Sequence, residues 1–88
     1  MEGLPRFSIE QIDDQSYFTL EFRRRATLED FQIIVEVSDN LRDWQSGPEV
    51  TTVLSVEPSG GEGERWIIRD NTPVEDRAFR FMRIRIQP

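Results

Sequence analysis

The sequence predicts an all-β fold, an antiparallel β-sandwich of about six to seven strands, with a small barrel as the alternative. Apolar and polar residues alternate with a period of two along most of the 88 residues, and turn-forming residues separate the alternating runs. No stretch of helical length carries an apolar stripe at three-to-four spacing. A chain of this length has room for one small hydrophobic core, so we expect a single domain over residues 1–88.

Three strands are expected in the N-terminal half. Phe7 and Ile9 alternate with polar neighbours until the pair Asp13-Asp14, whose turn chemistry ends the run. Two longer strands follow over residues 15–25 and 31–38, each with apolar side chains at every second position. Their inward residues are Phe18, Leu20 and Phe22 in the first, and Phe31, Ile33, Val35 and Val37 in the second.

The strands over residues 15–25 and 31–38 are expected to pair with each other as a hairpin. Placing their apolar faces on the same side of the sheet restricts the register. In an antiparallel pair the residue numbers of facing residues then add up to the same value along the hairpin. The same register sets Arg25 opposite Asp30, where a pair of opposite charges closes the loop. The apolar pairs of this register are Phe22/Ile33, Leu20/Val35 and Phe18/Val37.

The C-terminal half is expected to contain three more strands. The first is rich in β-branched residues and ends at Pro58, which lacks the N–H that a sheet ladder needs. Asparagine, threonine and proline later mark a longer connection, of the kind that carries a chain from one sheet to the other. The segments are a strand over 50–56, a hairpin loop over 59–63, a strand over 65–70, a crossing over 71–77 and a last strand over 79–87.

The composition argues against an enzyme. The chain has no His and no Cys, and all eleven of its basic residues are Arg. Imidazole, thiolate and lysine chemistry are therefore absent, together with the soft metal ligands. A carboxylate pair is still available, but a core of this size is too small to wall a sugar-binding cleft. We expect no catalytic residue, no cofactor and no metal site.

The formal charge of −6 disfavours binding to nucleic acid or to an anionic membrane. No apolar run approaches the roughly 20 residues of a membrane-spanning helix, so membrane insertion is not expected. The charge is uneven, because residues 77–88 contain four arginines and no acid. This arginine-rich segment is a candidate for pairing with an acidic partner.

Two motifs resemble those of a known group of domains. Residues 35–44 read V-E-V-S-D-N-L-R-D-W, similar to the V-E-x-S-x-D-L-x-x-W signature of small β-sandwich modules at the C-terminal ends of large secreted bacterial proteins. The sequences R-D-N-T-P at 69–73 and R-F-M-R-I at 80–84 resemble the closing pattern of the same modules, a D-x-x-P crossing followed by an R-F-Y-R-L strand. The resemblance covers residues 17–86.

The resemblance implies an immunoglobulin-like or fibronectin-III-like accessory domain with no activity of its own. It also implies that the domain is excised from the C-terminal end of a longer exported polypeptide, and that it is extracellular or at the cell surface. The function expected on this basis is interaction: packing against a neighbouring domain, surface attachment or export of a larger protein.

The sequence offers residues for two kinds of ligand site, and each also has an explanation in packing or turn structure. Trp44 and Trp66 are candidates for a sugar-stacking platform, although a place in the core is the better explanation for both. Oxygen ligands for calcium are available, but no loop has the ordered spacing of an EF-hand, and Asp39 and Asp70 are better explained by turn hydrogen bonds. The oxygen-bearing candidates are Asp39, Asn40, Asp43, Asp70, Asn71 and Asp76.

Several apolar residues fall on outward positions, where a solvated sheet favours threonine or charge, and arginines lie near them. Such a patch on a soluble domain usually indicates a partner. The candidate interaction face is Ile34, Val53, Ile67, Phe79 and Phe81, with Arg80, Arg83 and Arg85. Apolar residues scattered over an ordinary surface, or a strand read one residue out of phase, would explain the same pattern without a partner. If the patch is real, neighbouring domains or another protein are the expected partners. A carbohydrate-binding module and a small stand-alone protein that forms a weak homodimer are the alternatives.

Overall fold

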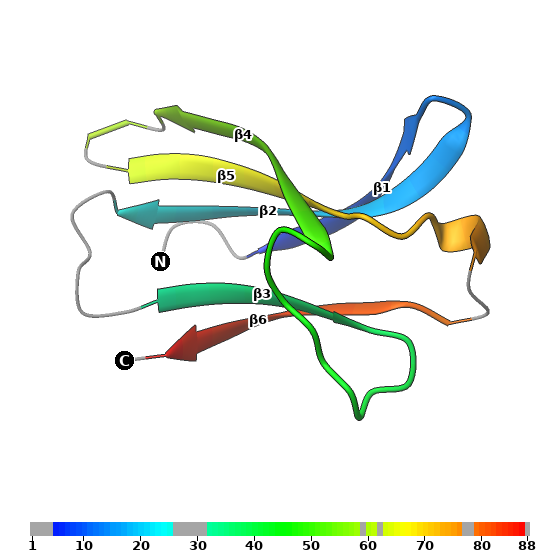
Figure 1. Cartoon of the computed structure of the whole chain (residues 1–88). Coiled ribbons are helices and arrows are strands. Elements are labelled where there is room, and N and C mark those ends of the chain that lie inside the picture. Colours follow the sequence, from blue (N-terminus) through cyan, green and yellow to red (C-terminus); the bar gives the residue numbers. More distant parts are fainter. Residues whose placement is uncertain (1–4, 26–31, 59, 62, 77–78, 88) are drawn as a thin grey trace.

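The computed structural model describes residues 5–25, 32–58, 60–61, 63–76 and 79–87. Within them, six strands form two antiparallel sheets that lie face to face (Figure 1). One sheet has the strand order β1-β2-β5-β4 and the other consists of β3 and β6. The predicted all-β, sandwich-like architecture is confirmed. The strands are β1 (Arg6–Ile12), β2 (Gln15–Arg25), β3 (Gln32–Ser38), β4 (Thr51–Pro58), β5 (Gly63–Asp70) and β6 (Phe81–Gln87).

A tight turn joins β1 to β2 and confirms the predicted role of the two aspartates. Ile12 pairs with Gln15, so Asp13 and Asp14 alone form the loop, with φ of 50° and 69°. Two positive φ values are characteristic of a type I′ turn, whose twist matches that of the flanking strands. Aspartate adopts this left-handed conformation more readily than most residues with a side chain.

The predicted hairpin between residues 15–25 and 31–38 is wrong. β2 lies between β1 and β5, whereas β3 pairs with β6 in the other sheet, with Val35 opposite Ile84. The two strands do face the same core, so the alternation assigned their inward faces correctly and their partners incorrectly. The proposed Arg25–Asp30 pair involves Asp30, which lies outside the described residues.

The core lies between the middle of the larger sheet and the smaller sheet. Leu20 from β2 and Val37 from β3 are both fully buried, at 0% exposure. Trp66 packs against the core cluster, and its ring stacks on that of Phe22 with centroids 6.2 Å apart. The packing role expected for Trp66 is therefore confirmed. The other buried apolar residues are Phe22, Val35 and Ile68.

The connection from β5 to β6 carries the chain from the larger sheet to the smaller one, as predicted. It contains a short 3₁₀ helix, η1 (Val74–Asp76). The backbone N–H of Ser16, at the start of β2, donates to both carboxylate oxygens of Glu75, at 3.1 and 3.2 Å. Glu75 therefore ties the crossing to the β1–β2 hairpin.

The turn geometry predicts that Asp14→Gly stabilises the protein by about 0.5–1 kcal/mol, because glycine adopts a positive φ without the steric cost that a Cβ imposes. Chemical denaturation measures the change in the free energy of unfolding. Glu10→Gly, placed within strand β1 of the same hairpin, is the control and should destabilise by a similar amount. If Asp14→Gly also destabilises, the turn does not have the conformation described.

The Glu75 contact predicts a pH-dependent stability. The Ser16 N–H lowers the pKa of Glu75 below its ordinary value of 4.5. A lowered pKa in the folded state stabilises the protein above the ordinary value, and this contribution disappears as the pH falls through the lowered one. Glu75→Gln should therefore lower the thermal midpoint at neutral pH and have little effect at strongly acidic pH. Glu49→Gln, at another exposed carboxylate, controls for the change in charge.

Candidate interaction surface

The structure brings together four of the eight residues of the candidate interaction face. Ile34 on β3 pairs with Arg85 on β6, and both lie on the outer face of the smaller sheet, away from the core. Arg83 and Phe81 alternate with the inward residues of β6 and share this face. Ile67 lies on the outer face of the larger sheet, next to buried Ile68. Phe79 precedes β6 and is 67% exposed.

Val53 does not point outward as predicted. It pairs with Ile68, a core residue, and so belongs to the inner face of the larger sheet. A bulge at Leu54 places Ser55 opposite Ile67. After the bulge, even-numbered residues of β4 instead of odd-numbered ones point to the inner face. Val53 is nevertheless 49% exposed, because β4 is an edge strand and the smaller sheet leaves this part of its inner face uncovered.

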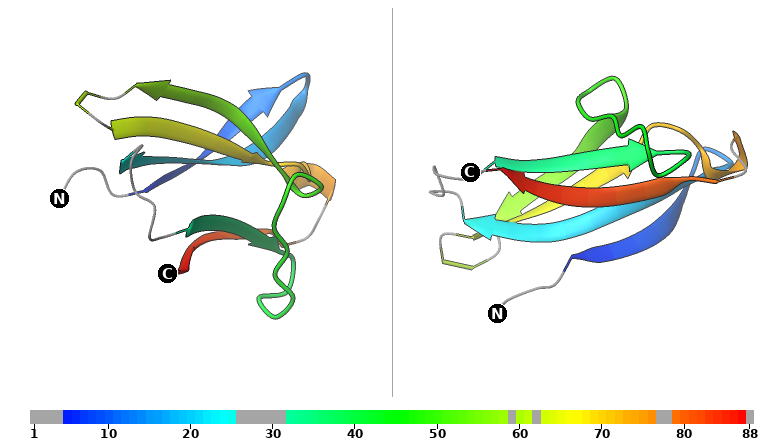
Figure 2. Two further views of the ribbon diagram at one scale, coloured as in Figure 1. Left: turned by 60° about the vertical axis from the view of Figure 1, so that its left-hand side comes forward. Right: turned by 90° about the horizontal axis from the view of Figure 1, so that it is seen from below.

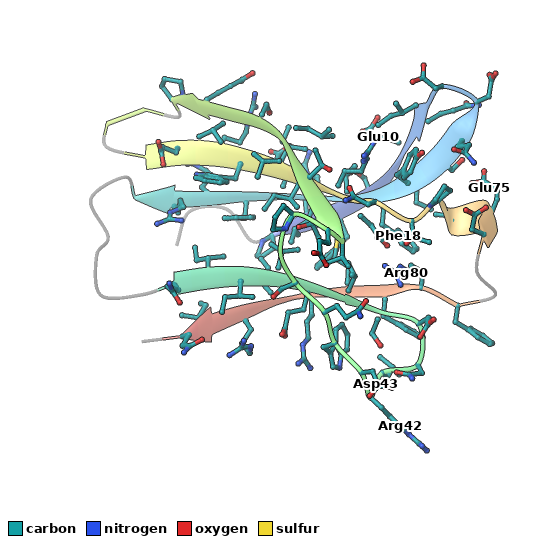
Figure 3. All side chains as sticks on the ribbon, viewed as in Figure 1. Glu10, Phe18, Arg42, Asp43, Glu75 and Arg80 are labelled. Carbon is teal, nitrogen blue, oxygen red and sulfur yellow. The ribbon has the colours of Figure 1, made fainter. Side chains whose placement is uncertain are left out.

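Arg80 is a buried structural residue, not an exposed rim residue as predicted. Its Nε and Nη2 donate to the two carboxylate oxygens of Asp70 at 2.6 and 2.9 Å, and the side chains are 7% and 0% exposed. The hydrogen bonds to Asp70 raise the pKa of Arg80, although burial alone would lower it. In Figure 3, Arg80 and Phe18 lie between the sheets, whereas Arg42 and Asp43 project from the tip of a loop.

The sequence contains a signal for the buried position of Arg80. Arg80 lies two and four positions before Met82 and Ile84, which pack against the core cluster. In an extended segment its side chain therefore points to the same, inward side. An arginine on the inward phase of a strand requires a buried carboxylate. Asp70, at the end of the preceding strand, supplies that carboxylate.

A charged cluster covers the outer face of the smaller sheet. Glu36 is only 6% exposed, and its Oε1 accepts from Nε of Arg83 at 2.9 Å. Nε of Arg85 lies 3.3 Å from the same oxygen. The guanidinium of Arg83 also lies over the ring of Trp44, 3.9 Å from its centroid. Two cations therefore share one carboxylate, which leaves this cluster with a net positive charge.

The loop after β3 carries Trp44 to this outer face, so Trp44 does not close the main core as expected. Ser38 Oγ accepts from the backbone N–H groups of Asn40 and Leu41, at 3.1 and 2.9 Å. Asn40 Oδ1 then accepts from the N–H groups of Arg42 and Asp43, both at 2.8 Å. Trp44 is half-buried, and its Nε1 donates to the carbonyl of Leu41 at 3.3 Å.

The loop and the start of β6 border a groove of about 280 Å³. It extends from the inner face of β1 and β2 to the outer face of β6. Sequence reasoning missed this groove, because alternation shows which way a side chain points and not whether anything covers it. The lining residues are Phe7, Phe18, Leu41, Trp44, Arg80, Phe81 and Met82.

The oxygen-bearing side chains considered for calcium do not converge. No group of three carboxylates that could hold a metal occurs in the described part of the chain. Asp43 accepts from Asn40 Nδ2 at 2.9 Å, and Asp70 Oδ1 accepts from the N–H of Thr72 at 3.0 Å, the turn bond expected of it. Asn71 Oδ1 accepts from Thr52 Oγ1 at 2.5 Å.

No family model, curated protein or solved structure matches this chain. Within the residues that the structure describes, no helix is long and apolar enough to cross a membrane. The residues of this chain, through their chemistry and geometry, are therefore the basis for inferring a function.

The buried ion pair predicts a strong asymmetry between single and double substitutions. Asp70→Asn leaves a buried arginine without its counter-charge and should cost about 3–5 kcal/mol, whereas Asp70→Asn with Arg80→Met should recover most of that loss. Chemical denaturation of both variants tests this. The control is the exposed Arg65–Glu57 pair, at 2.6 Å, where Glu57→Gln should cost less than about 1 kcal/mol. Equal losses at the two pairs would show that the Asp70 carboxylate is not desolvated.

Proposed function

We propose that this chain is a non-catalytic interaction module of a larger exported or cell-surface protein, and that it packs against a neighbouring domain. The absence of His, Cys and Lys supports a role without catalysis. The motifs at residues 35–44 and 69–84 support a place among the accessory modules that they resemble.

The observation that carries the proposal is the incomplete cover of the larger sheet. A two-stranded sheet lies over a four-stranded one, so the described residues leave the inner faces of both edge strands open. On β1, Phe7 and Ile9 are 52% and 57% exposed, and on β4, Val53 and Val56 are 49% and 41% exposed. Apolar side chains on the core side of a sheet that remain in water favour a partner that covers them.

We infer that the strand order corresponds to that of an immunoglobulin constant-type domain. In that fold the strands A, B, E and D form one sheet and C, F and G the other. The order β1-β2-β5-β4 opposite β3-β6 corresponds to A-B-E-D opposite C-F. On this reading, the described residues lack a strand in the position of G, which lies beside F.

The carbohydrate-binding alternative is less well supported. Arginine guanidinium groups lie over both tryptophan rings, Arg83 over Trp44 and Arg24 over Trp66, the latter at 5.4 Å. Trp66 also stacks on Phe22. These contacts occupy aromatic surface that a sugar ring would need.

The proposal predicts that the native product is larger than the 10.4 kDa of these 88 residues. An antibody against the domain, followed by mass spectrometry of the captured native protein, measures its mass. Hydrogen exchange then compares the native product with the isolated chain. We expect slower exchange in β1 and β6 of the native product and no change in the interior of β2, which is covered in both. A native mass of 10.4 kDa contradicts the module, and unchanged exchange in a larger product contradicts the packing.

A further inference from the structure

One edge of the smaller sheet is open within the described part of the chain. β6 pairs with β3 on one side, and no strand of the described residues pairs with its other side. The far edge of β3 is different, because Val37 exchanges two backbone hydrogen bonds with Gln45, at 2.9 and 3.0 Å. Unpaired N–H and C=O groups on an edge strand are a template for a further strand.

The open edge of β6 lies next to the uncovered part of the larger sheet. Phe7 pairs with Leu20 and Ile9 with Phe18, so both β1 residues share the face of a core strand. The view from below in Figure 2 shows β1 beyond the edge of β6 on that side. A strand added to β6 would therefore cover Phe7 and Ile9. It would also cover Ile86, which pairs with Ile33 on the inward phase and is 62% exposed.

The charges on β6 indicate the composition of that strand. Arg83 and Arg85 point to the outer face, share the single carboxylate of Glu36, and have side chains that are each 46% exposed. Acidic residues opposite them would balance the remaining positive charge, because opposite charges across a ladder attract. The inward positions of the same strand would be apolar, since they would meet Phe7 and Ile9.

A second copy of this chain fits the edge poorly. In an antiparallel β6–β6 pairing that keeps the apolar faces together, arginines of one copy lie directly opposite or diagonal to arginines of the other. Like charges in such positions are destabilising.

We propose that the open edge of β6 accepts, as an additional strand, an extended segment of a neighbouring domain in which apolar and acidic residues alternate. This inference rests on the proposed function, because it identifies the surface and the kind of segment through which the module packs. Backbone hydrogen bonds to β6 provide the attachment, the groove beside Phe7 and Met82 receives the apolar side chains, and Arg83 and Arg85 select for acid.

The probe is a synthetic peptide as long as β6, 7 residues, with the sequence Val-Glu-Val-Glu-Val-Glu-Val. The matched control replaces every glutamate by lysine. Fluorescence anisotropy of labelled peptides should show binding of the glutamate peptide at least about fivefold tighter than that of the control, with the preference decreasing as salt is added. Amide chemical-shift changes should centre on β1, β6 and the residues that line the groove, and should leave β4 unchanged.

A tethered form measures the same interaction when free peptide binds weakly. The glutamate strand joined to Pro88 by a flexible Gly/Ser linker reaches an effective concentration in the millimolar range. The fusion should raise the thermal midpoint by about 5 °C or more, and the lysine fusion should raise it less. Absence of a rise in the glutamate fusion, or an equal rise in both fusions, overturns the proposal.

Two surface variants distinguish binding at the β6 edge from nonspecific binding to exposed apolar side chains. Ile9→Thr, at an exposed position, should weaken binding of the glutamate peptide several-fold without lowering the thermal midpoint of the free chain. Val56→Thr, on the uncovered flank of β4, is the control and should leave binding unchanged. Arg85→Gln should reduce the preference for glutamate over lysine. If Ile9→Thr and Val56→Thr weaken peptide binding equally, or if the amide chemical-shift changes centre on β4, the peptide does not bind at the β6 edge.

The inference and the proposed function can fail separately. A native mass of 10.4 kDa removes the neighbouring domain and so overturns both the module and this partner, even if the peptide binds. If the native product is larger, but the glutamate strand binds neither as a free peptide nor in the fusion, the module is retained and the strand-accepting edge is overturned. A dimer of the isolated chain with intermolecular contacts between two β6 strands assigns the edge to a second copy and also overturns it.

Discussion

The buried ion pair between Asp70 and Arg80 is the constraint on which the arrangement of the two sheets depends. Asp70 ends β5 in one sheet and Arg80 immediately precedes β6 in the other, so a bidentate contact links them across the crossing. Both groups lose most of their hydration, and only close hydrogen bonding offsets that cost. The carboxylate also accepts the Thr72 N–H, which shapes the first residues of the crossing. The position of β6 over β2 thus follows from a polar contact as well as from apolar packing.

The small size of the second sheet explains most of the surface chemistry. Two strands cover the middle of the larger sheet, where Leu20 and Ile68 are buried, and leave the inner faces of β1 and β4 in contact with water. The two uncovered flanks differ, since Gln45 occupies the adjoining edge of β3 while the described residues place nothing on the edge of β6. Exposed apolar residues and unpaired backbone groups therefore coincide on one side of the molecule.

Alternation predicted the strands and their inward faces, because side-chain direction in a strand is a local property. It did not predict pairing. Phe22 and Val35 both face the core, and any two strands with matching faces satisfy the same condition, so the hairpin between them was as consistent with the pattern as the actual cross-sheet packing. Short loops made two partners predictable: β1 and β2 pair across the turn at Asp13-Asp14, and β4 and β5 pair on either side of the hairpin loop expected at 59–63.

The candidate site was predictable to a smaller extent, for two physical reasons. The bulge at Leu54 reverses the phase of β4 without a glycine or proline to mark it, so Val53 was assigned to the wrong face. Coverage is a property of the assembled sheets, and no local pattern reports that Phe7 lies beyond the edge of β6. Arg83 and Arg85 were placed correctly on an outer face, because they alternate with inward apolar residues.

The pairing of β3 with β6 also determines when the domain can fold during synthesis. Glu36 and Arg83 are 47 positions apart, so the contact forms only after β6 has been synthesised. Until then β3 has no paired strand, and Asp70 has no ion pair with Arg80. By contrast, β1 and β2 can pair early, because a short turn joins them. Val35 and Val37 of the nascent chain stay exposed until β6 has been synthesised. β6 therefore closes the core, and the domain completes its fold only after this strand has left the ribosome.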